Sequence, residues 1–283
     1  MEGSRTPREE QVGIVTELAT QLGELAARLA VAAGRLVFEG RKNGITSSST
    51  KSSDTDVVTE FDRASERMIV EGLRAERPND ALVGEEGTDS AGASGVRWLI
   101  DPIDGTTNFL YDLPGYAVSI AALDHDGPLV GAVYVPSSGE LFTASRGRGA
   151  LLDGVPIHCG TTATIEQALV ATGFSYLVDR RRDQGQRFAQ LIPKIRDIRR
   201  FGAASTDLCY VAAGRLDVYF EQWLGPWDWA AGELIAREAG CRTGRFDGGS
   251  LDRTEVLAAN PALFEQMVEL LAVTEPGHNP GIM

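Results

Sequence analysis

The chain has 283 residues, 43% of them hydrophobic and 24% charged, so it can bury a full core and is not a disordered polymer. Its 40 acidic and 27 basic residues give a formal net charge of −13, which argues against nucleic acid or an anionic membrane as the main partner. Three widely spaced cysteines, and no apolar run approaching the ~20 residues of a membrane span, predict a cytoplasmic protein without a disulfide framework.

The N-terminal part of the chain predicts two helices. Apolar residues recur every three or four positions over 15–36, which indicates one long amphipathic helix. Residues 42–53 are rich in Ser and Thr and predict a mobile loop. A second helix is predicted at 60–76, with Thr59 and Asp62 as a capping pair at its start.

From about residue 97 the pattern becomes extended. Segments rich in Val, Ile, Leu and Tyr between turn residues predict an antiparallel meander at 97–101, 116–124, 128–135 and 139–144. Further along, strands are predicted at 168–173, 217–220 and 256–259, alternating with helices at 183–192, 205–213, 228–239 and 261–272. We therefore expect a mixed α/β fold, a layered α+β sandwich with a site between two adjoining halves, 12–160 and 161–273, and flexible ends at 1–11 and 274–283.

The densest chemical motif is Asp-Pro-Ile-Asp-Gly-Thr-Thr-Asn-Phe at 101–109. Asp101 falls where a buried strand ends, Asp104 follows three residues later, and Gly105 permits a tight turn that exposes backbone N–H groups. Carboxylate oxygens suit a hard cation such as Mg²⁺, and the N–H groups suit an anion. The same residues are also compatible with an Asp-rich turn whose side chains cap their own backbone.

Two further acidic positions accompany this motif. Glu85 follows the apolar residues 81–83 at the end of another predicted strand, and Asp228 lies in Trp-Asp-Trp-Ala-Ala-Gly at 227–232, where a helix begins. Each also has a simpler interpretation, an ordinary acidic loop for Glu85 and a helix-dipole partner for Asp228. In combination with 101–109 they favour a site for divalent cations and phosphate.

With these motifs the chain resembles the inositol monophosphatase family of Mg²⁺-dependent, lithium-sensitive phosphatases, over about residues 15–272. The signatures at 101–109 and 227–232 and the spacing of the four carboxylates carry the resemblance. It implies alternating α-β-α-β-α layers, as in fructose-1,6-bisphosphatase, and a homodimer. It also implies hydrolysis of inositol 1-phosphate, or a similar small polyol phosphate, to the alcohol and inorganic phosphate by metal-activated water.

The resemblance further implies roles for individual residues. Two to three Mg²⁺ ions would be held by Glu85, Asp101, the Ile103 carbonyl, Asp104 and Asp228. The catalytic residues would be Thr106, its partner Asp56, and Glu85. Substrate contacts would come from Gly105, Thr106, Ala204, Glu221 and Asp228. The loop that contains Asp56 matches the family's mobile element but is two residues longer between Lys51 and Asp56.

Other functions remain open at this point. The alternatives with the same chemistry are fructose-1,6-bisphosphatase, histidinol-phosphate phosphatase and nucleotide 3′-phosphate phosphatase. Thr107 in the Gly-Thr-Thr-Asn run favours the inositol branch over these. A non-catalytic regulatory protein that binds the transcription machinery is the alternative from another class, although all four side-chain metal ligands are kept. Cys209 and Arg215 have the spacing of a cysteine phosphatase motif, but the residues between them predict a packed helix, so Cys209 is interpreted as a core residue.

Overall fold

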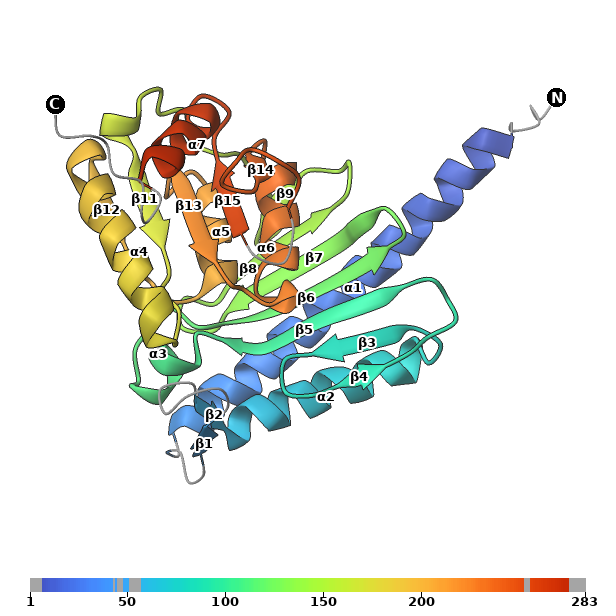
Figure 1. Ribbon diagram of the computed structural model, residues 1–283. Coiled ribbons are helices and arrows are strands. Elements are labelled where there is room, and N and C mark those ends of the chain that lie inside the picture. Colours follow the sequence, from blue (N-terminus) through green and yellow to red (C-terminus); the bar gives the residue numbers. More distant parts are fainter. Residues whose placement is uncertain (1–6, 43, 45–47, 51–56, 252–254, 275–283) are drawn as a thin grey trace, which may run out of the picture.

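The computed structural model describes residues 7–42, 44, 48–50, 57–251 and 255–274, with the backbone alone at 7–15 and 57. Helices and sheets alternate in five layers (Figure 1). This arrangement confirms the predicted α-β-α-β-α order. Among the described residues, no helix is both long enough and apolar enough to cross a membrane.

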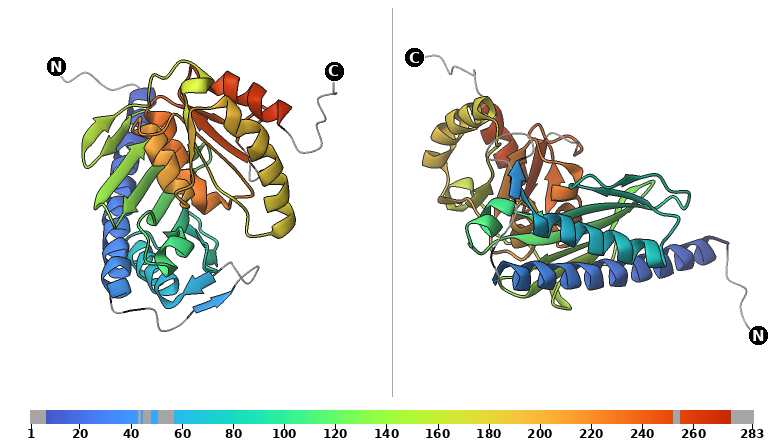
Figure 2. Two further views of the ribbon diagram at one scale, coloured as in Figure 1. Left: turned by 90° about the vertical axis from the view of Figure 1, so that its left-hand side faces the viewer. Right: turned by 90° about the horizontal axis from the view of Figure 1, so that it is seen from below.

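The first layer consists of α1 (Pro7–Lys42) and α2 (Glu60–Glu76), which lie side by side on one face of the larger sheet (Figure 2). Small and apolar residues of α1, such as Leu22 and Ala26, pack with Trp98 and Ile120 of the sheet. The helix extends beyond the predicted 15–36 at both ends. The predicted capping pair of α2 is present, because Asp62 accepts from Thr59 N at 2.8 Å and Thr59 Oγ1 accepts from Phe61 N.

The second layer is an eight-stranded sheet in the order β10-β9-β8-β7-β6-β5-β3-β4. Its strands are β3 (Ala81–Gly84), β4 (Asp89–Ser90), β5 (Arg97–Asp104), β6 (Ala117–Asp124), β7 (Gly127–Val135), β8 (Glu140–Ser145), β9 (Ala150–Leu152) and β10 (Val155–Ile157). The strands from β5 to β8 form the predicted antiparallel meander, and β9 and β10 extend it. By contrast, β3 runs parallel to β5. The short strands β4, β9 and β10 were not predicted, since two or three residues show no periodicity.

The central layer consists of α5 (Ala204–Ala212) and α6 (Pro226–Glu238), which pack between the two sheets. Leu208, Cys209, Leu234 and Ile235 are completely buried there. Both helices begin within two residues of the predicted positions. Cys209 is a core residue on α5, as the sequence predicted.

The outer layers are a five-stranded sheet, ordered β12-β11-β13-β15-β14, and the helices that cover its far face. The strands are β11 (Leu169–Thr172), β12 (Asp197–Arg199), β13 (Val218–Gln222), β14 (Arg242–Gly244) and β15 (Glu255–Ala259); the helices are α4 (Val178–Leu191) and α7 (Phe264–Val273) with the short turns Ile165–Gln167 and Ile192–Lys194. β11 runs parallel to both β12 and β13. The carboxyl ends of these three strands therefore lie at one edge.

Several other segments also differ from the sequence prediction. Residues 48–50, inside the predicted loop 42–53, form β1 (Ser48–Thr50) and pair antiparallel with β2 (Val57–Thr59), a partner that local sequence does not reveal. α4 begins at Val178, five residues early, because its first turn is polar and exposed and carries no helical apolar pattern. β5 continues past 101 to Asp104.

Candidate active site

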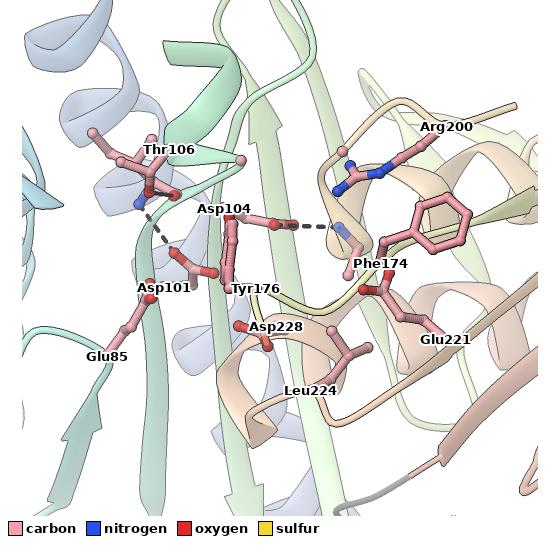
Figure 3. Close-up of a pocket in the computed structure, with 14 residues that line it drawn as sticks. Glu85, Asp101, Asp104, Thr106, Phe174, Tyr176, Arg200, Glu221, Leu224 and Asp228 are labelled. Carbon is pink, nitrogen blue, oxygen red and sulfur yellow. Dashed lines mark hydrogen bonds between the residues drawn. The ribbon is translucent and has the colours of Figure 1, made fainter. Parts of the chain in front are cut away.

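A cavity with about 620 Å³ of empty space, its open mouth included, lies between the ends of the two sheets (Figure 3). Every sequence-predicted site residue within the described part of the chain lines it: Glu85, Asp101, Ile103, Asp104, Gly105, Thr106, Ala204, Glu221 and Asp228. Asp56, and Lys51 before it, lie outside the described residues.

Glu85 and Asp101 are brought together by the parallel pairing of β3 and β5. Gly84 is in register with Ile100, and the N–H of Glu85 donates to the Ile100 carbonyl at 3.1 Å. Since both strands end at the same edge of the sheet, the two carboxylates that follow them are neighbours. The buried strand pattern before each acidic residue thus places both side chains in the cavity.

Asp104 reaches the cavity through a bulge in β5. Asp101 pairs with Ser119 and Asp104 with Ala117, so three steps on β5 match two on β6. The bulge accommodates Pro102, which has no N–H for the ladder. Beyond it, Gly105 adopts φ +91°, and a Cβ there would lie 3.1 Å from the carbonyl oxygens of two neighbouring glycines, so the turn requires glycine.

The carboxylate of Asp104 is held by the start of α5. It accepts hydrogen bonds from the Ala204 N–H at 3.2 Å, the Ser205 N–H at 2.6 Å and the Ser205 hydroxyl at 2.5 Å. The N-terminal end of a helix stabilises negative charge. The hydrogen bonds between Asp104 and Ser205 therefore join the larger sheet to the central layer. The sequence analysis did not predict this contact of Ser205.

Asp228 enters the cavity from the first turn of α6. Its carboxylate accepts from the Gly225 N–H at 2.7 Å, so it caps the helix, as the simpler interpretation of its position suggested. The hydroxyl of Ser119 donates to the Trp227 carbonyl at 3.1 Å. Because Ser119 pairs with Asp101 across the ladder, this contact fixes α6 beside the other carboxylates.

The acidic groups raise one another's pKa. Burial, followed by the charges of Glu85, Asp104 and Asp228, holds the pKa of Asp101 well above its usual value. Burial, followed by the charges of Glu85 and Asp104, likewise holds the pKa of Asp228 well above its usual value. Burial raises the pKa of Asp104 to about 7 despite its bonds to Ser205. Ionising all of these groups together requires compensating positive charge. Hard, oxygen-binding divalent cations therefore fit this donor set.

Metal binding should accordingly depend on pH in a defined direction. A carboxyl group whose pKa is higher in the folded than in the unfolded state contributes to folding stability at low pH, and this contribution is lost as the pH rises. For Asp104 the loss occurs between about pH 4 and pH 7. We expect 5 mM Mg²⁺ to raise the Tm by about 5 °C or more at pH 7.5 relative to EDTA. The rise should be smaller at pH 5. Equal rises at both pH values, or an equal rise with KCl of matched ionic strength, would contradict the assignment.

The hydroxyl of Thr106 contacts Asp62, an aspartate that the sequence analysis had assigned only to the start of a helix. Thr106 Oγ1 lies 3.1 Å from Asp62 Oδ1 and 3.0 Å from the Ile103 carbonyl oxygen. The sequence analysis named Asp56 as its partner, and that residue lies outside the described part of the chain; among the described residues the carboxylate beside Thr106 is Asp62, the capping residue of α2. Asp62 is fully buried and also accepts from the Thr59 hydroxyl at 2.6 Å, so its position is fixed.

Two more residues of α2 support the site. The Ser65 hydroxyl donates to the Pro102 carbonyl at 3.1 Å. Glu66 accepts from the N–H groups of Glu86 at 2.8 Å and Thr88 at 3.1 Å, which fixes the turn that carries Glu85. Both side chains are buried. The sequence could have indicated them, because they are polar residues on the face of α2 that its amphipathic pattern assigns to the core.

The opposite wall of the cavity is formed by the edge where β11, β12 and β13 end together. Phe174 follows β11, Arg200 follows β12 and Glu221 lies near the end of β13 (Figure 3). The Tyr219 hydroxyl donates to Glu221 at 2.7 Å, and burial raises the pKa of Glu221. A Cβ at Gly173 would collide with the Glu221 carboxylate, so the glycine makes room for it. The sequence analysis named Glu221, and Arg200 lies in the segment 199–204, which resembles the substrate-side stretch of the family; Phe174 was not predicted.

A second acidic group lies on the surface turn between β6 and β7. Asp124, His125 and Asp126 place metal-type ligand atoms within 4.8 Å of one another. Arg146 already ion-pairs with Asp124 at 2.8 Å and lies 3.9 Å from Asp126. Because the group is exposed and compensated by this arginine, its charges create no comparable demand for a cation.

Comparison with known proteins gives a consistent result. The family model described as "Inositol monophosphatase family" matches residues 19–274. The chain is 42% identical to inositol-1-monophosphatase of Mycobacterium leprae, over 78% of this chain and 80% of that protein. It is 40% identical to a Pseudomonas aeruginosa protein named Nus factor SuhB, over 91% of this chain and 97% of that protein.

Solved structures agree with the sequence relatives. The extragenic suppressor protein suhB from Bartonella henselae superposes with a TM-score of 0.84 at 34% identity, covering 89% of this chain and 98% of that one. The similarity thus includes both sheets and the central helices that surround the cavity.

Proposed function

Because this chain belongs to the inositol monophosphatase family, we propose that it is a Mg²⁺-dependent phosphomonoesterase that hydrolyses inositol 1-phosphate or a similar small polyol phosphate. The observation that supports this most is the convergence of four carboxylates on one cavity beside the turn at Gly105. Inositol-1-monophosphatases among its relatives support the same chemistry.

The proposed metal ligands are Glu85, Asp101, Asp104, Asp228 and the carbonyl of Ile103. When bound, Mg²⁺ at these groups would supply an activated water molecule and positive charge for the phosphoryl group and the leaving oxygen. The chain contributes the fixed positions of the carboxylates, through the bulge of β5 and the first turns of α5 and α6. It also contributes the turn at Gly105 and Thr106, whose N–H groups we assign to the phosphate oxygens.

Thr106 and Asp62 provide a path for the proton of the attacking water. While the Thr106 hydroxyl donates its proton toward Asp62 Oδ1, 3.1 Å away, its lone pairs can accept a hydrogen bond from water in the cavity. Asp62 is held by Thr59 and does not have to move. We therefore assign to Asp62 the role that the sequence analysis gave to Asp56, with Glu85 beside Asp101 as a second acceptor.

Glu221 is proposed to bind substrate hydroxyl groups. Its carboxylate is oriented by the Tyr219 hydroxyl and faces the cavity across from Glu85 and Asp101 (Figure 3). A carboxylate in this position accepts hydrogen bonds from a polyol, and a substrate without hydroxyl groups leaves it unpaired. Ala204, at the start of α5, also lines the cavity, and its N–H donates to Asp104.

Replacing Glu221 by glutamine should therefore reduce selectivity. We expect Glu221→Gln to lower kcat/KM for inositol 1-phosphate. The corresponding loss of transition-state stabilisation is ~1–2 kcal/mol, the contribution of one charge-assisted hydrogen bond. Hydrolysis of an aryl phosphate should change little. Glu255→Gln is the matched control, because Glu255 pairs with Gln222 on the next strand and does not line the cavity. Equal losses on both substrates would show that Glu221 serves the metal ligands or the fold.

Lithium sensitivity is a further proposal. The ligand set around Asp104 and Asp228 offers small, hard oxygen donors that accept Li⁺ as well as Mg²⁺. We expect uncompetitive or mixed inhibition with respect to substrate, measured by phosphate release at several Li⁺ concentrations. An active enzyme that is insensitive to high-millimolar Li⁺ would contradict this role of the Asp104 and Asp228 ligands.

The second candidate function is regulatory. Relatives named Nus factor SuhB favour the alternative that the sequence analysis left open, a regulatory protein that binds the transcription machinery. Phosphate release from a panel of phosphate esters, with Mg²⁺ and with EDTA, separates the two. Mg²⁺-dependent turnover supports the phosphatase, and its absence with every ester would overturn that proposal. The homodimer that the resemblance implied and the cytoplasmic location that the cysteine content and the lack of a long apolar run predicted remain predictions.

A further inference from the structure

Two of the three cysteines meet at the end of α6 that is distant from the cavity. α6 begins at the cavity with Asp228, and Cys241 follows its other end, directly before β14. Cys159 follows β10. Because α6 lies beside β9 and β14 (Figure 1), segments that are distant in the sequence come together there. Neither cysteine lines the cavity and both are free thiols, so the proposed hydrolysis does not use them.

The backbone holds these two cysteines against the same helix end. α6 ends in a left-handed turn, in which Gly240 has φ +96° and the Cys241 N–H donates to the Ala236 carbonyl at 3.0 Å. The Cys159 N–H donates to the Ala239 carbonyl at 3.0 Å, one residue before that glycine. A Cβ at Gly240 would lie 3.7 Å from Cys159 Sγ, so the sulfur atom lies against this turn. Main-chain hydrogen bonds therefore fix both cysteines relative to each other.

The two thiols differ in exposure and in acidity. Cys241 is buried in the core of the central layer, whereas Cys159 packs against that core and is half-buried. A hydrogen bond from the Cys241 thiol lowers the pKa of Cys159 to about 7, and the same bond, together with burial, raises the pKa of Cys241. A partly exposed thiol with a large thiolate fraction is the one that reacts with an oxidant, and the buried neutral thiol beside it is placed to react second.

The surroundings of the pair favour oxidation over metal binding. A structural metal site needs about four ligands, and two sulfur atoms supply only half of them. Among the residues that the structure describes, no His, Asp or Glu joins these two cysteines in a group that could hold a metal ion. The chemistry left to two neighbouring thiols is the formation of a disulfide.

We propose that Cys159 and Cys241 form a redox-sensitive pair, which hydroperoxides convert to a disulfide and dithiols restore. In the first step the Cys159 thiolate attacks an oxygen of hydrogen peroxide and the O–O bond breaks. This step gives a sulfenic acid at Cys159 and a hydroxide ion, which takes up the thiol proton to form water. In the second step the Cys241 sulfur attacks Cys159 Sγ, the S–O bond breaks, and the hydroxyl group leaves with the Cys241 proton as a second water. The peroxide accepts both electrons, so two thiols and one peroxide yield one disulfide and two waters.

The disulfide would join the segment after β10 to the end of α6. A cross-link between positions far apart in the chain restricts the unfolded state and thereby stabilises the folded one. Because the two thiols are already hydrogen-bonding partners, their sulfur atoms are close to bonding distance in the folded protein. We therefore expect the oxidised protein to have a Tm about 5 °C or more above that of the reduced protein.

The experiment treats the full chain, reduced and then freed of reductant, with hydrogen peroxide in about 10-fold excess. Alkylation under denaturing conditions followed by intact mass measurement counts the free thiols, which should fall from three to one. A proteolytic digest should locate the new bond between Cys159 and Cys241. Dithiothreitol should restore all three thiols. Cys209 is the internal control: it is fully buried on α5, burial raises its pKa, and it should stay reduced throughout.

Two variants separate the roles of the cysteines. Cys241→Ser should stop at the sulfenic acid of Cys159, which dimedone traps, and should form no disulfide within the chain. Cys159→Ser should leave Cys241 reduced and lower the rate of thiol loss by about 10-fold or more, because the reactive thiolate is gone. The rise in Tm on oxidation should be absent in both variants.

Three free thiols in the peroxide-treated wild type would overturn the proposal, and so would disulfides that form only between molecules. A Tm that falls on oxidation would overturn it as well, since the cross-link would then oppose the folded arrangement of the pair. If either serine variant does not fold, the thiol count and the digest of the wild type decide the question by themselves. None of these measurements depends on hydrolysis of a phosphate ester, so they test the pair independently of the proposed function.

Discussion

Replacing Asp104 by asparagine should lower kcat for inositol 1-phosphate by at least ~10²-fold, about 2.7 kcal/mol of transition-state stabilisation. The carboxylate is placed for charge: burial raises its pKa to about 7, and the start of α5 supplies three hydrogen bonds to it. Asparagine has nearly the same shape but carries no charge. We therefore expect a folded protein with weakened affinity for Mg²⁺, measured by calorimetry beside the phosphate-release assay.

The control for this variant is Asp112→Asn, a neighbouring aspartate whose side chain is 76% exposed and outside the cavity. It should keep wild-type turnover and Mg²⁺ affinity. Wild-type turnover in Asp104→Asn would contradict the metal assignment. A Tm lowered by more than about 10 °C would instead show that the bonds from Asp104 to Ser205 are mainly structural.

Removing the hydroxyl of Thr106 should have an effect of similar size. Thr106→Val keeps the branched shape but removes the hydroxyl that lies 3.1 Å from Asp62, so kcat should fall by ~10²-fold or more. KM and the affinity for Mg²⁺ should change much less, because no metal ligand is altered. The measurements are steady-state kinetics and calorimetric titration with Mg²⁺.

Thr107→Val is the matched control. Its hydroxyl is exposed and lies 3.4 Å from the Tyr176 hydroxyl, so its loss should leave kcat nearly unchanged. Asp62→Asn gives a second test: it should reduce kcat as Thr106→Val does, and also lower the Tm through loss of the helix cap. If Thr106→Val and Thr107→Val behave alike, the proposed proton path is wrong.

The missed partner of Thr106 shows where local sequence is insufficient. Asp62 was correctly predicted as the capping residue of α2, and that role already explained its presence. Its second oxygen contacts Thr106, 44 residues away in the chain. Only the packing of α2 against β5 brings the two together, as the bond from Ser65 to Pro102 also shows. A local pattern assigns one role to such a residue and leaves its long-range contact undetermined.

Local sequence patterns were enough to predict the elements with long periodicity and the residues that can carry the chemistry. The meander from β5 to β8, the helices α1 and α2, and the acidic residues after 81–83 and 98–100 follow from short-range rules of burial and pairing. These rules depend on neighbours within a few residues, which is why they can be applied to a chain without its structure. The family resemblance could also be recognised from the sequence, because each of the two signatures is a continuous run of residues.

Tertiary structure alone decided which strand ends face each other. Glu85 and Asp101 meet because β3 is parallel to β5, and Phe174, Arg200 and Glu221 meet because β11 is parallel to both of its neighbours on that side. Parallel strands are joined through distant connections, so the pairing leaves no local trace in the sequence. The cavity forms where these two edges approach, held by the hydrogen bonds of Asp104 to the start of α5 and of Ser119 to α6. Among the described residues that line it, the single cation, Arg200, could be identified only from this arrangement.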